Sequence, residues 1–211
     1  MYQTWVFDCD GVILDSNRVK TEAFRQVGNQ FGEQVATNLV EYHLNHGGFS
    51  RYNKFEYLLT NVLKQDSDPI KVTELANQYS ECVYEKLLNC SVVDGLGKLR
   101  QSTKDSRWMV VSGSDQLELR LLFKALHIDY FFDAGIYGSP QNKDEIIDEQ
   151  HKLGNLLRPA LFLGDSRYDH LTAKRAGIDF IFVSGWTDFK DWQNYVSQNK
   201  LLSINHVSDL I

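Results

Sequence analysis

The sequence predicts an α/β fold in which a parallel sheet carries an inserted, all-helical cap domain. Five short apolar runs with the composition of β-strands recur along the chain, most of them a helix-length apart. The long interval between the first two runs has the periodicity of helices throughout. Acidic, hydroxyl and lysine side chains follow the ends of the runs, where parallel sheets bind ligands. We therefore expect a core domain formed by residues 1–15 and 90–211 and a cap domain formed by residues 16–89.

The predicted strands are apolar on consecutive residues, which is typical of strands covered on both faces. Each is followed by Gly, Ser or Asp, and most intervals leave room for a helix, so the runs predict βα units that build a parallel sheet. The expected strands, in chain order, are Thr4–Phe7, Trp108–Val111, Ala134–Tyr137, Ala160–Leu163 and Phe180–Val183, with a weaker one near Leu201–Ile204.

The segment from about Ser16 to Asn89 contains no convincing strand, and its apolar residues recur at helical spacing. Gly32 is a candidate helix end, and Ser50 is a candidate N-cap. The segment is too long for one crossover helix, which predicts a helical domain inserted after the first strand. Three apolar stripes are expected to face inward: Val19, Ala23, Val27 and Phe31; Tyr52, Phe55, Leu59, Val62 and Leu63; and Val72, Leu75, Ala76, Tyr79 and Val83, with Thr73 near its start.

The composition limits the classes of partner. The 211 residues are 43% hydrophobic, enough for a sizeable core, and the net charge is −6. This acidic balance argues against a nucleic acid or an anionic membrane as partner, whereas a small phosphorylated molecule is compatible with it, because a local site can oppose the global charge. Three cysteines indicate reduced thiols, and no apolar run approaches membrane-spanning length. We expect a soluble cytoplasmic protein; the sequence does not specify its oligomeric state.

The first predicted strand runs directly into two carboxylates, Asp8 and Asp10, and then into Gly11. Carboxylates two residues apart repel each other, and a divalent cation or bound cationic groups would offset that repulsion. Glycine lets the turn close tightly and brings backbone N–H groups near an anion. The alternative is an acidic turn at a strand end with no chemical role.

The next two strand ends carry groups suited to a phosphoryl group. Ser112, Gly113 and Ser114 stand between a strand and a helix, where a hydroxyl and N–H groups form a ready anion site. The simpler alternative is that Ser114 only caps the helix. Lys143 opens a later helix, a position where the helix dipole disfavours a cation. We expect it either to be solvated or to be held by acids and phosphate.

The fourth strand end supplies a further acid, Asp165, with Asp169 one helical turn later. Because the carboxyl ends of parallel strands meet at one edge, Asp8, Asp10 and Asp165 are expected to lie close together. Three carboxylates suit a hard cation such as Mg²⁺, which prefers oxygen ligands.

These four strand ends together resemble the motifs of the haloacid dehalogenase superfamily of phosphohydrolases. The resemblance is to the branch with a helical cap between the first and second motifs, which includes phosphoglycolate phosphatase-like proteins, and it implies a Rossmann-like parallel sheet core. It spans nearly the whole chain. The motifs match as Asp8-Cys9-Asp10-Gly11-Val12 with Asp15-Ser16, then Ser112, then Lys143, and finally Gly164-Asp165 with Asp169.

The resemblance implies a two-step reaction. Asp8 would attack phosphorus and form an aspartyl-phosphate, and Asp10 would protonate the leaving alcohol and then take a proton from the hydrolysing water. Mg²⁺ would be held by the Asp8 carboxylate, the Asp10 backbone carbonyl and Asp165. Phosphoryl oxygens would be bound by Ser112 and Lys143 with the neighbouring backbone of Gly11 and Gly113, and Asp169 would orient Lys143 or a metal-bound water.

One residue departs from the family pattern. The third motif often has proline directly after its lysine, whereas Asp144 follows Lys143 here. No nearby lysine competes for the role, because Lys152 lies well into the helix.

The loop at residues 46–54 corresponds in place to the substrate-specificity loop of capped relatives. Arg51 and Lys54 lie about one turn apart on one face and are candidates to bind an anionic or hydroxyl-rich leaving group. The alternative is a solvated basic face. His43 and His46 are expected to be ordinary surface or partly buried residues.

The sequence thus predicts a Mg²⁺-dependent phosphatase of a small phosphorylated metabolite, such as a sugar phosphate or phosphoglycolate. A phosphotransferase of the β-phosphoglucomutase type is the nearest alternative because it shares the four motifs. A non-catalytic binding module on the same fold is a further alternative, which the clustered carboxylates disfavour because unneeded ones would cost stability. The presence of Asp10 argues against the dehalogenase and phosphonate-cleaving branches of the family, because those branches do not need an acid two residues after the nucleophile.

Overall fold

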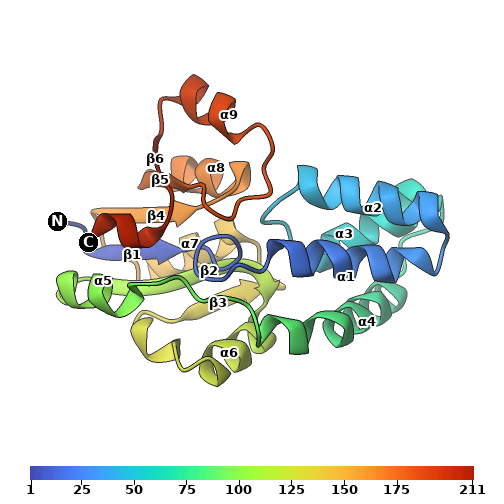
Figure 1. The fold of residues 1–211 in the computed structure, drawn as a ribbon, viewed down its shortest axis with the longest axis horizontal. Coiled ribbons are helices and arrows are strands. Elements are labelled where there is room, and N and C mark those ends of the chain that lie inside the picture. Colours follow the sequence, from blue (N-terminus) through green and yellow to red (C-terminus); the bar gives the residue numbers. More distant parts are fainter.

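The computed structural model describes residues 1–211 and contains one sheet of six parallel strands in the order β3-β2-β1-β4-β5-β6 (Figure 1). The predicted α/β class and the predicted strands are therefore confirmed. Because β1 lies between β2 and β4, the chain connections on its two sides run in opposite directions across the sheet. In such sheets a crevice forms at the carboxyl end of the central strand, and ligands bind there. The strands are β1 (Thr4–Phe7), β2 (Arg107–Asp115), β3 (Ile136–Ser139), β4 (Ala160–Gly164), β5 (Asp179–Val183) and β6 (Leu202–Ile204).

Strand β2 continues beyond its apolar part. The sequence predicts an end at Val111, whereas main-chain pairing with β3 resumes at Asp115, opposite Ser139. Four residues on β2 are thus matched by two on β3, which is a bulge. Side-chain polarity cannot reveal this pairing, because backbone groups make it. The bulge falls on the predicted phosphate-binding segment.

Two apolar clusters cover the two faces of the sheet, and alternate residues of β1 belong to different clusters. Val6 joins the cluster beneath α7 (Lys143–Lys152) and α8 (Arg167–Ala176). Trp5 and Phe7 join the larger cluster, which includes residues of α5 (Leu96–Ser102) and α6 (Gln116–Ala125). Burial on both faces explains the unbroken apolar run, and each large side chain contributes roughly 1.5–3 kcal/mol. The last α-helix, α9 (Trp192–Asn199), follows β5, and a short 3-10 helix (Val207–Leu210) follows β6.

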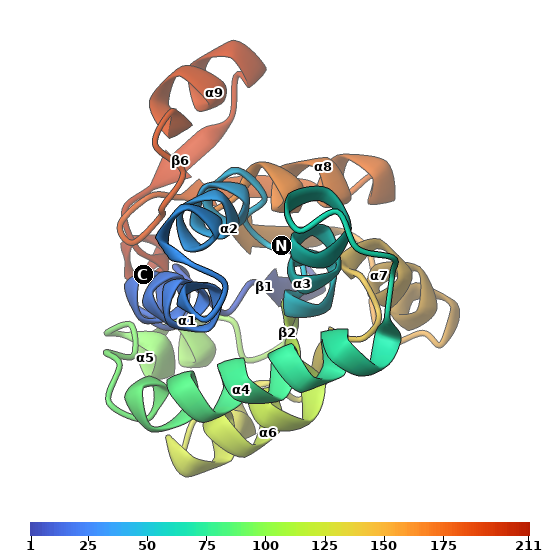
Figure 2. The same ribbon diagram turned by 90° about the vertical axis from the view of Figure 1, so that its right-hand side faces the viewer.

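The interval after β1 is helical, as predicted. It forms α1 (Asn17–Asn29), α2 (Glu33–Asn45), α3 (Arg51–Tyr57), a π-helical turn (Leu58–Val62) and α4 (Pro69–Leu87). These helices lie together beyond the carboxyl end of the sheet (Figure 1), and the view from their side shows α1, α2 and α3 grouped over the end of β1 with α4 alongside α6 (Figure 2). On this arrangement we propose residues 16–89 as a cap domain.

The cap helices begin where side chains can satisfy their free N–H groups. The predicted N-cap Ser50 accepts the N–H of Asn53. Helix α4 begins at Pro69, capped by Asp68, four residues before Thr73. Gly32 has a φ of 105° and opens α2, so it begins a helix in addition to following one. The π-helical turn carries no sequence signal that distinguishes it from an α-helix.

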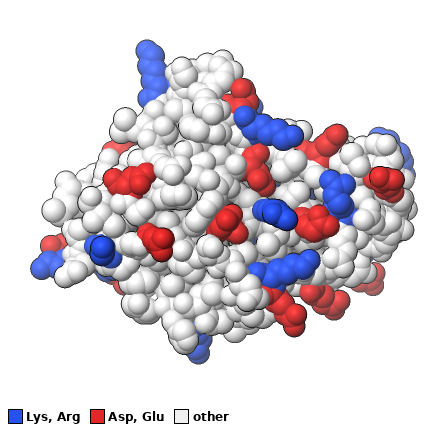
Figure 3. All heavy atoms as spheres, in the orientation of Figure 1, with Lys and Arg blue, Asp and Glu red and all other residues white.

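The surface and the thiols agree with the composition. On the face in Figure 3, acidic and basic side chains are interspersed, and neither sign fills the face. Cys9, Cys82 and Cys90 are free thiols. No helix combines the length and the apolar character that crossing a membrane requires.

Candidate active site

Asp8 is the first residue after β1 and is buried at the carboxyl edge of the sheet. Its Oδ1 accepts the N–H of Cys9 at 2.7 Å and lies 2.9 Å from the Lys143 ammonium. The turn that follows requires Gly11, whose φ is +75° and whose missing Cβ would lie 2.1 Å from Asp165 Oδ2. Glycine thus serves both the turn and the close approach of the fourth strand end.

Lys143 joins two of the acids. It is 1% exposed, and its Nζ donates to Asp169 at 2.6 Å while it contacts Asp8. Burial opposes its charge, but Asp169 and Asp8 raise the pKa of Lys143 above its ordinary value. These two carboxylates explain how a cation is tolerated in the first turn of a helix. Of the two states predicted for Lys143, solvated or held by acids, the structure has the second.

Asp169 is fixed from the other side by Ser166. The Ser166 N–H donates to Asp169 Oδ2 at 3.1 Å and the Asp169 N–H donates to Ser166 Oγ at 3.2 Å, which together form the capping box of α8. The Ser166 hydroxyl donates to the same Oδ2 at 2.6 Å. Both oxygens of Asp169 are therefore occupied, one by Lys143 and one by Ser166. The spacing Ser166-x-x-Asp169 is typical of a capping box, so this contact could have been predicted from the sequence.

Carboxylates exceed cations in this cluster. Asp8, Asp165 and Asp169 each place an oxygen within 4.8 Å of the others, and Lys143 is the ammonium among them. Burial and then Asp169 raise the pKa of Asp8 to about 7. Burial and then Asp8 raise the pKa of Asp165 well above its ordinary value. Clustered oxygen ligands with uncompensated charge fit a hard divalent cation such as Mg²⁺. Asp165 is oriented by Asn17, which donates to its Oδ2 at 3.0 Å.

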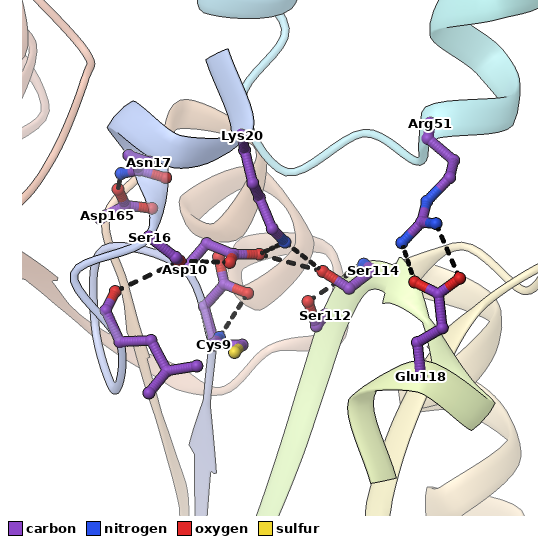
Figure 4. A network of polar contacts seen from close by, with 12 residues as sticks. Cys9, Asp10, Ser16, Asn17, Lys20, Arg51, Ser112, Ser114, Glu118 and Asp165 are labelled. Carbon is purple, nitrogen blue, oxygen red and sulfur yellow. Dashed lines mark hydrogen bonds and ion pairs between the residues drawn. The ribbon is translucent and has the colours of Figure 1, made fainter. Parts of the chain in front are cut away.

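Asp10 is held apart from this cluster by three side chains (Figure 4). Ser16 donates to its Oδ1, while Lys20 and Ser114 donate to its Oδ2, the latter at 3.0 Å. Although burial opposes ionisation, Lys20 holds the pKa of Asp10 below its ordinary value. Because Lys20 belongs to α1 and Ser114 to β2, the Asp10 carboxylate joins the core to the cap.

Lys20 is the main site residue that the sequence analysis missed. It lies on the buried side of α1 with Ala23 and Phe24, at the helical spacing of the first apolar stripe. A lysine on an apolar stripe is a signal that a buried acid faces it. The partner itself cannot be found from this spacing.

The segment after the apolar part of β2 has several separate roles. Ser112 is fully buried and accepts the N–H of Ser114 at 3.1 Å. The interpretation of Ser114 as a helix cap is wrong, because Asp115 caps α6 and accepts two of its N–H groups. A Cβ on Gly113 would lie 2.3 Å from the carbonyl oxygen of Gly48, so glycine here lets the cap loop approach the core.

A cavity of about 820 Å³ lies between the carboxyl edge of the sheet and the cap helices. Its core side includes Asp8, Asp10 and Asp165, and its cap side includes His43 and Lys54. The predicted site residues from the first and fourth strand ends thus share one cavity with side chains of the cap. Tyr168 also lines it, beside the glycines of the cap loop.

Arg51 is already paired. Its guanidinium donates to both oxygens of Glu118, at 3.0 and 2.6 Å (Figure 4). It also donates to the Ser80 hydroxyl. Arg51 and Lys54 are both buried, so the alternative of a solvated basic face is wrong. The role of Arg51 in binding the leaving group stays a prediction. The charge of Arg51 is neutralised by Glu118, which lies too far away in the chain for a local sequence pattern to reveal the pair.

Comparisons with known proteins agree with this architecture. The family model described as haloacid dehalogenase-like hydrolase matches residues 5–183. A comparison with curated proteins finds no match. Among solved structures, β-phosphoglucomutase from Clostridium difficile is 19% identical with a TM-score of 0.78, covering 100% of this chain and 94% of that one.

Two further solved structures have the same fold. A predicted phosphatase from Clostridium acetobutylicum is 19% identical with a TM-score of 0.76, covering 100% of this chain and 96% of that one. CbbY from Rhodobacter sphaeroides, solved in complex with phosphate, is 17% identical with a TM-score of 0.71 and the same coverage of the two chains. At such identities the likeness shows the fold, and the chemistry has to be argued from the site.

Proposed function

Because the chain belongs to the haloacid dehalogenase-like hydrolases, we propose that it is a Mg²⁺-dependent phosphatase of a small phosphorylated metabolite, acting through an aspartyl-phosphate on Asp8. One observation carries the proposal. The buried Asp8 carboxylate faces a cavity, is contacted by Lys143, and lies within reach of two further acids. We also propose a cytoplasmic location, where its three free thiols would stay reduced.

Asp8 is suited to act as the nucleophile through one particular oxygen. The contacts from the Cys9 N–H and from Lys143 both fall on Oδ1, so Oδ2 carries no hydrogen bond from the protein. In the first step, Asp8 Oδ2 forms a bond to phosphorus as the bond from phosphorus to the leaving oxygen breaks. In the second step, water forms a bond to phosphorus, the bond to Asp8 breaks, and inorganic phosphate leaves.

Asp10 is suited to move the proton in both steps. It donates a proton to the leaving oxygen in the first step and accepts one from the attacking water in the second, so it ends the cycle as it began. Its hydrogen bonds to Ser16, Lys20 and Ser114 hold it on the cap side of Asp8. Lys20 favours the ionised form of Asp10, which is the form that accepts the proton from water.

The remaining residues bind charge. Lys143 and Ser112, with the backbone of Gly11 and Gly113, are the proposed partners of the phosphoryl oxygens. Both carboxylate oxygens of Asp169 already accept hydrogen bonds, one from Lys143 and one from Ser166. This favours a role for Asp169 in orienting Lys143. The Asp8 and Asp165 carboxylates and the Asp10 backbone carbonyl would hold Mg²⁺, which when bound neutralises phosphoryl charge.

A phosphotransferase is the second candidate, because a β-phosphoglucomutase shares the fold at a TM-score of 0.78. The same acids at Asp8 and Asp10 would serve both reactions, which differ in whether water or a sugar hydroxyl accepts the phosphoryl group. Products therefore distinguish them. Incubation with a hexose 1-phosphate releases inorganic phosphate if the protein is a phosphatase and forms the isomeric hexose phosphate if it is a mutase.

The central experiment measures phosphate release from an aryl phosphate with Mg²⁺ in the wild type and in Asp8→Asn. The substitution keeps the size of the side chain and removes the nucleophilic oxygen, so turnover should fall by at least about 10⁴-fold. Asp94→Asn, which changes an exposed acid, is the matched control and should retain activity. Equal turnover by the wild type and Asp8→Asn would overturn the proposed function. A subsequent screen of phosphorylated metabolites would then identify the substrate.

A further inference from the structure

Lys54 is a buried cation without an acidic partner. Four lysine and arginine side chains of the protein are buried: Lys20, Arg51, Lys54 and Lys143. The other three each form a salt bridge, with Asp10, Glu118 and the pair of Asp8 and Asp169 respectively. Lys54 is 3% exposed, lies in α3, and lines the cavity above the reacting groups. A buried ammonium that is not neutralised costs free energy, which a bound anion would offset.

The position of Lys54 is fixed by two neutral side chains, those of His43 and Thr21. Its Nζ lies 2.9 Å from His43 Nδ1, and His43 Nε2 lies 3.1 Å from the Thr21 hydroxyl. Burial and then Lys54 hold the pKa of His43 well below its ordinary value, so the ring is neutral and Nδ1 accepts from Lys54. Thr21 in turn donates to Asp188 at 3.4 Å. One of the three N–H groups of Lys54 is thus used, and the other two are free for a ligand.

The electrostatic surroundings of Lys54 favour an anion. Burial and then the charge of Lys20 lower the pKa of Lys54 to about 7. The Phe24 ring, 5.2 Å from Nζ, supplies no full charge. The charged groups that act on Lys54 across the cavity are Lys20 of α1, Asp10 and Asp8 after β1, and Lys143 of α7.

We propose that Lys54, held by His43, binds a second anionic group on the leaving-group part of the substrate, either a carboxylate or a phosphate. The inference rests on the proposed function, since it assumes that the transferred phosphoryl group lies at Asp8. Asp8 belongs to the core side of the cavity and Lys54 to the cap side, so a leaving group extends from one toward the other. Arg51, the other candidate of the cap, is already neutralised by Glu118.

The test measures binding rather than turnover. Titration calorimetry on Asp8→Asn compares two matched pairs of probes: phosphoglycolate with hydroxyethyl phosphate, and phosphoglycerate with glycerol phosphate. Within each pair a carboxylate replaces a neutral CH₂OH group. The anionic member should bind about 10- to 100-fold more tightly, because a hydrogen bond to a charged group contributes about 1.5–3 kcal/mol. The affinity for an alkanediol bisphosphate is then compared with the affinity for the corresponding monophosphate. This comparison tests whether phosphate is the preferred second anionic group.

Lys54→Met in the same background should abolish this preference and leave the affinity for the neutral probes within about twofold. Lys98→Met, which removes an exposed lysine of α5, is the matched control and should keep the preference. Above pH 7, binding of the anionic probes should take up a proton, seen as a heat that varies with the buffer, because the anion raises the pKa of Lys54 from about 7. This uptake should vanish in Lys54→Met.

The outcomes separate the two proposals. Equal affinities within both pairs for the Lys54-containing protein, or the same preference in Lys54→Met, would overturn this inference even if the wild type hydrolyses phosphomonoesters. An absence of hydrolysis together with a preserved preference would overturn the phosphatase and retain the anion site. If Lys54→Met does not fold, the affinity ratio and the proton uptake of the Lys54-containing protein still decide the question.

Discussion

The two sides of the cavity carry opposite charge. On the core side, Asp8, Asp165 and Asp169 share the single ammonium of Lys143. On the cap side, Lys20 and Lys54 are buried cations. Asp10 neutralises Lys20, whereas Lys54 has no acidic partner. Under the proposed function, the core side would bind a cation and the cap side an anion. A phosphorylated metabolite bound together with a divalent cation meets both needs, which is why the two sides are best considered as one site.

After Asp8→Asn, the strongest effect is expected at Asp10, which links the two sides. Asp10→Asn keeps the size of the side chain but cannot move a proton, so kcat should fall by about 10²–10⁴-fold. The Mg²⁺ concentration for half-maximal activity should change little, because the backbone carbonyl of Asp10 is the proposed ligand. Steady-state phosphate release across a Mg²⁺ series measures both quantities. A larger change in Mg²⁺ dependence than in kcat would contradict the proton-transfer role.

The next effect concerns the charge of the core side. The pKa of Asp8 is raised from 3.8 to about 7, so the folded protein binds the proton more tightly than the unfolded chain. The stabilisation is complete below about pH 4 and is lost as the pH rises through about 7. Without Mg²⁺, the free energy of unfolding should therefore decrease over this range.

Mg²⁺ should restore this stability most strongly at alkaline pH, by about 2.7 kcal/mol at one hundred times its dissociation constant. Urea unfolding at pH 5 and pH 8, with Mg²⁺ and with a chelator, measures the difference. Asp8→Asn is the control and should lose the part of the pH dependence that Asp8 contributes, while the part due to the raised pKa of Asp165 remains. An equal gain from Mg²⁺ at both pH values would contradict a site built on raised carboxylates.

A smaller effect is expected where the cap contacts the core through Arg51 and Glu118. The pair is bidentate and Arg51 is buried, although Glu118 is partly exposed. A double-mutant cycle with Arg51→Met and Glu118→Gln should give a coupling of about 1–2 kcal/mol in unfolding. Because Arg51 is neutralised in the wild type, Arg51→Met should change the KM of anionic substrates less than Lys54→Met does. The reverse order would make Arg51 the specificity residue.

The smallest expected effect is at Lys20. Its charge lowers the pKa of Asp10, so Lys20→Met should move the limb of the pH–rate profile that reports Asp10 to higher pH. The maximal rate should fall less than in Asp10→Asn, since the carboxylate remains. Lys86→Met, which removes an exposed lysine of α4, is a suitable control. An unshifted profile would show that Lys20 serves packing alone.

The strand ends could be predicted because their signals are local. The apolar runs that end at Phe7 and Leu163 are followed by an acid within two residues, and parallel pairing brings the ends of neighbouring strands together. Ser50 could be identified as an N-cap because its partner lies three residues away. The partners of Arg51 and Lys20 could not be found in this way. Arg51 meets Glu118 at a separation of 67 residues, and a charge can pair with any opposite charge that folding brings near.

The α/β class, the helical insertion and the acids at the edge of the sheet follow from local sequence, because periodicity and strand-end residues act over a few positions of the chain. Which cations are neutralised and which is left for a ligand depends on contacts between residues that are far apart in the chain. Arg51 and Lys54 lie on the same helix, yet α6 supplies a carboxylate to the first, while the second meets a neutral histidine. That difference depends on how the cap docks on the core, and docking is a property of distant surfaces rather than of local sequence.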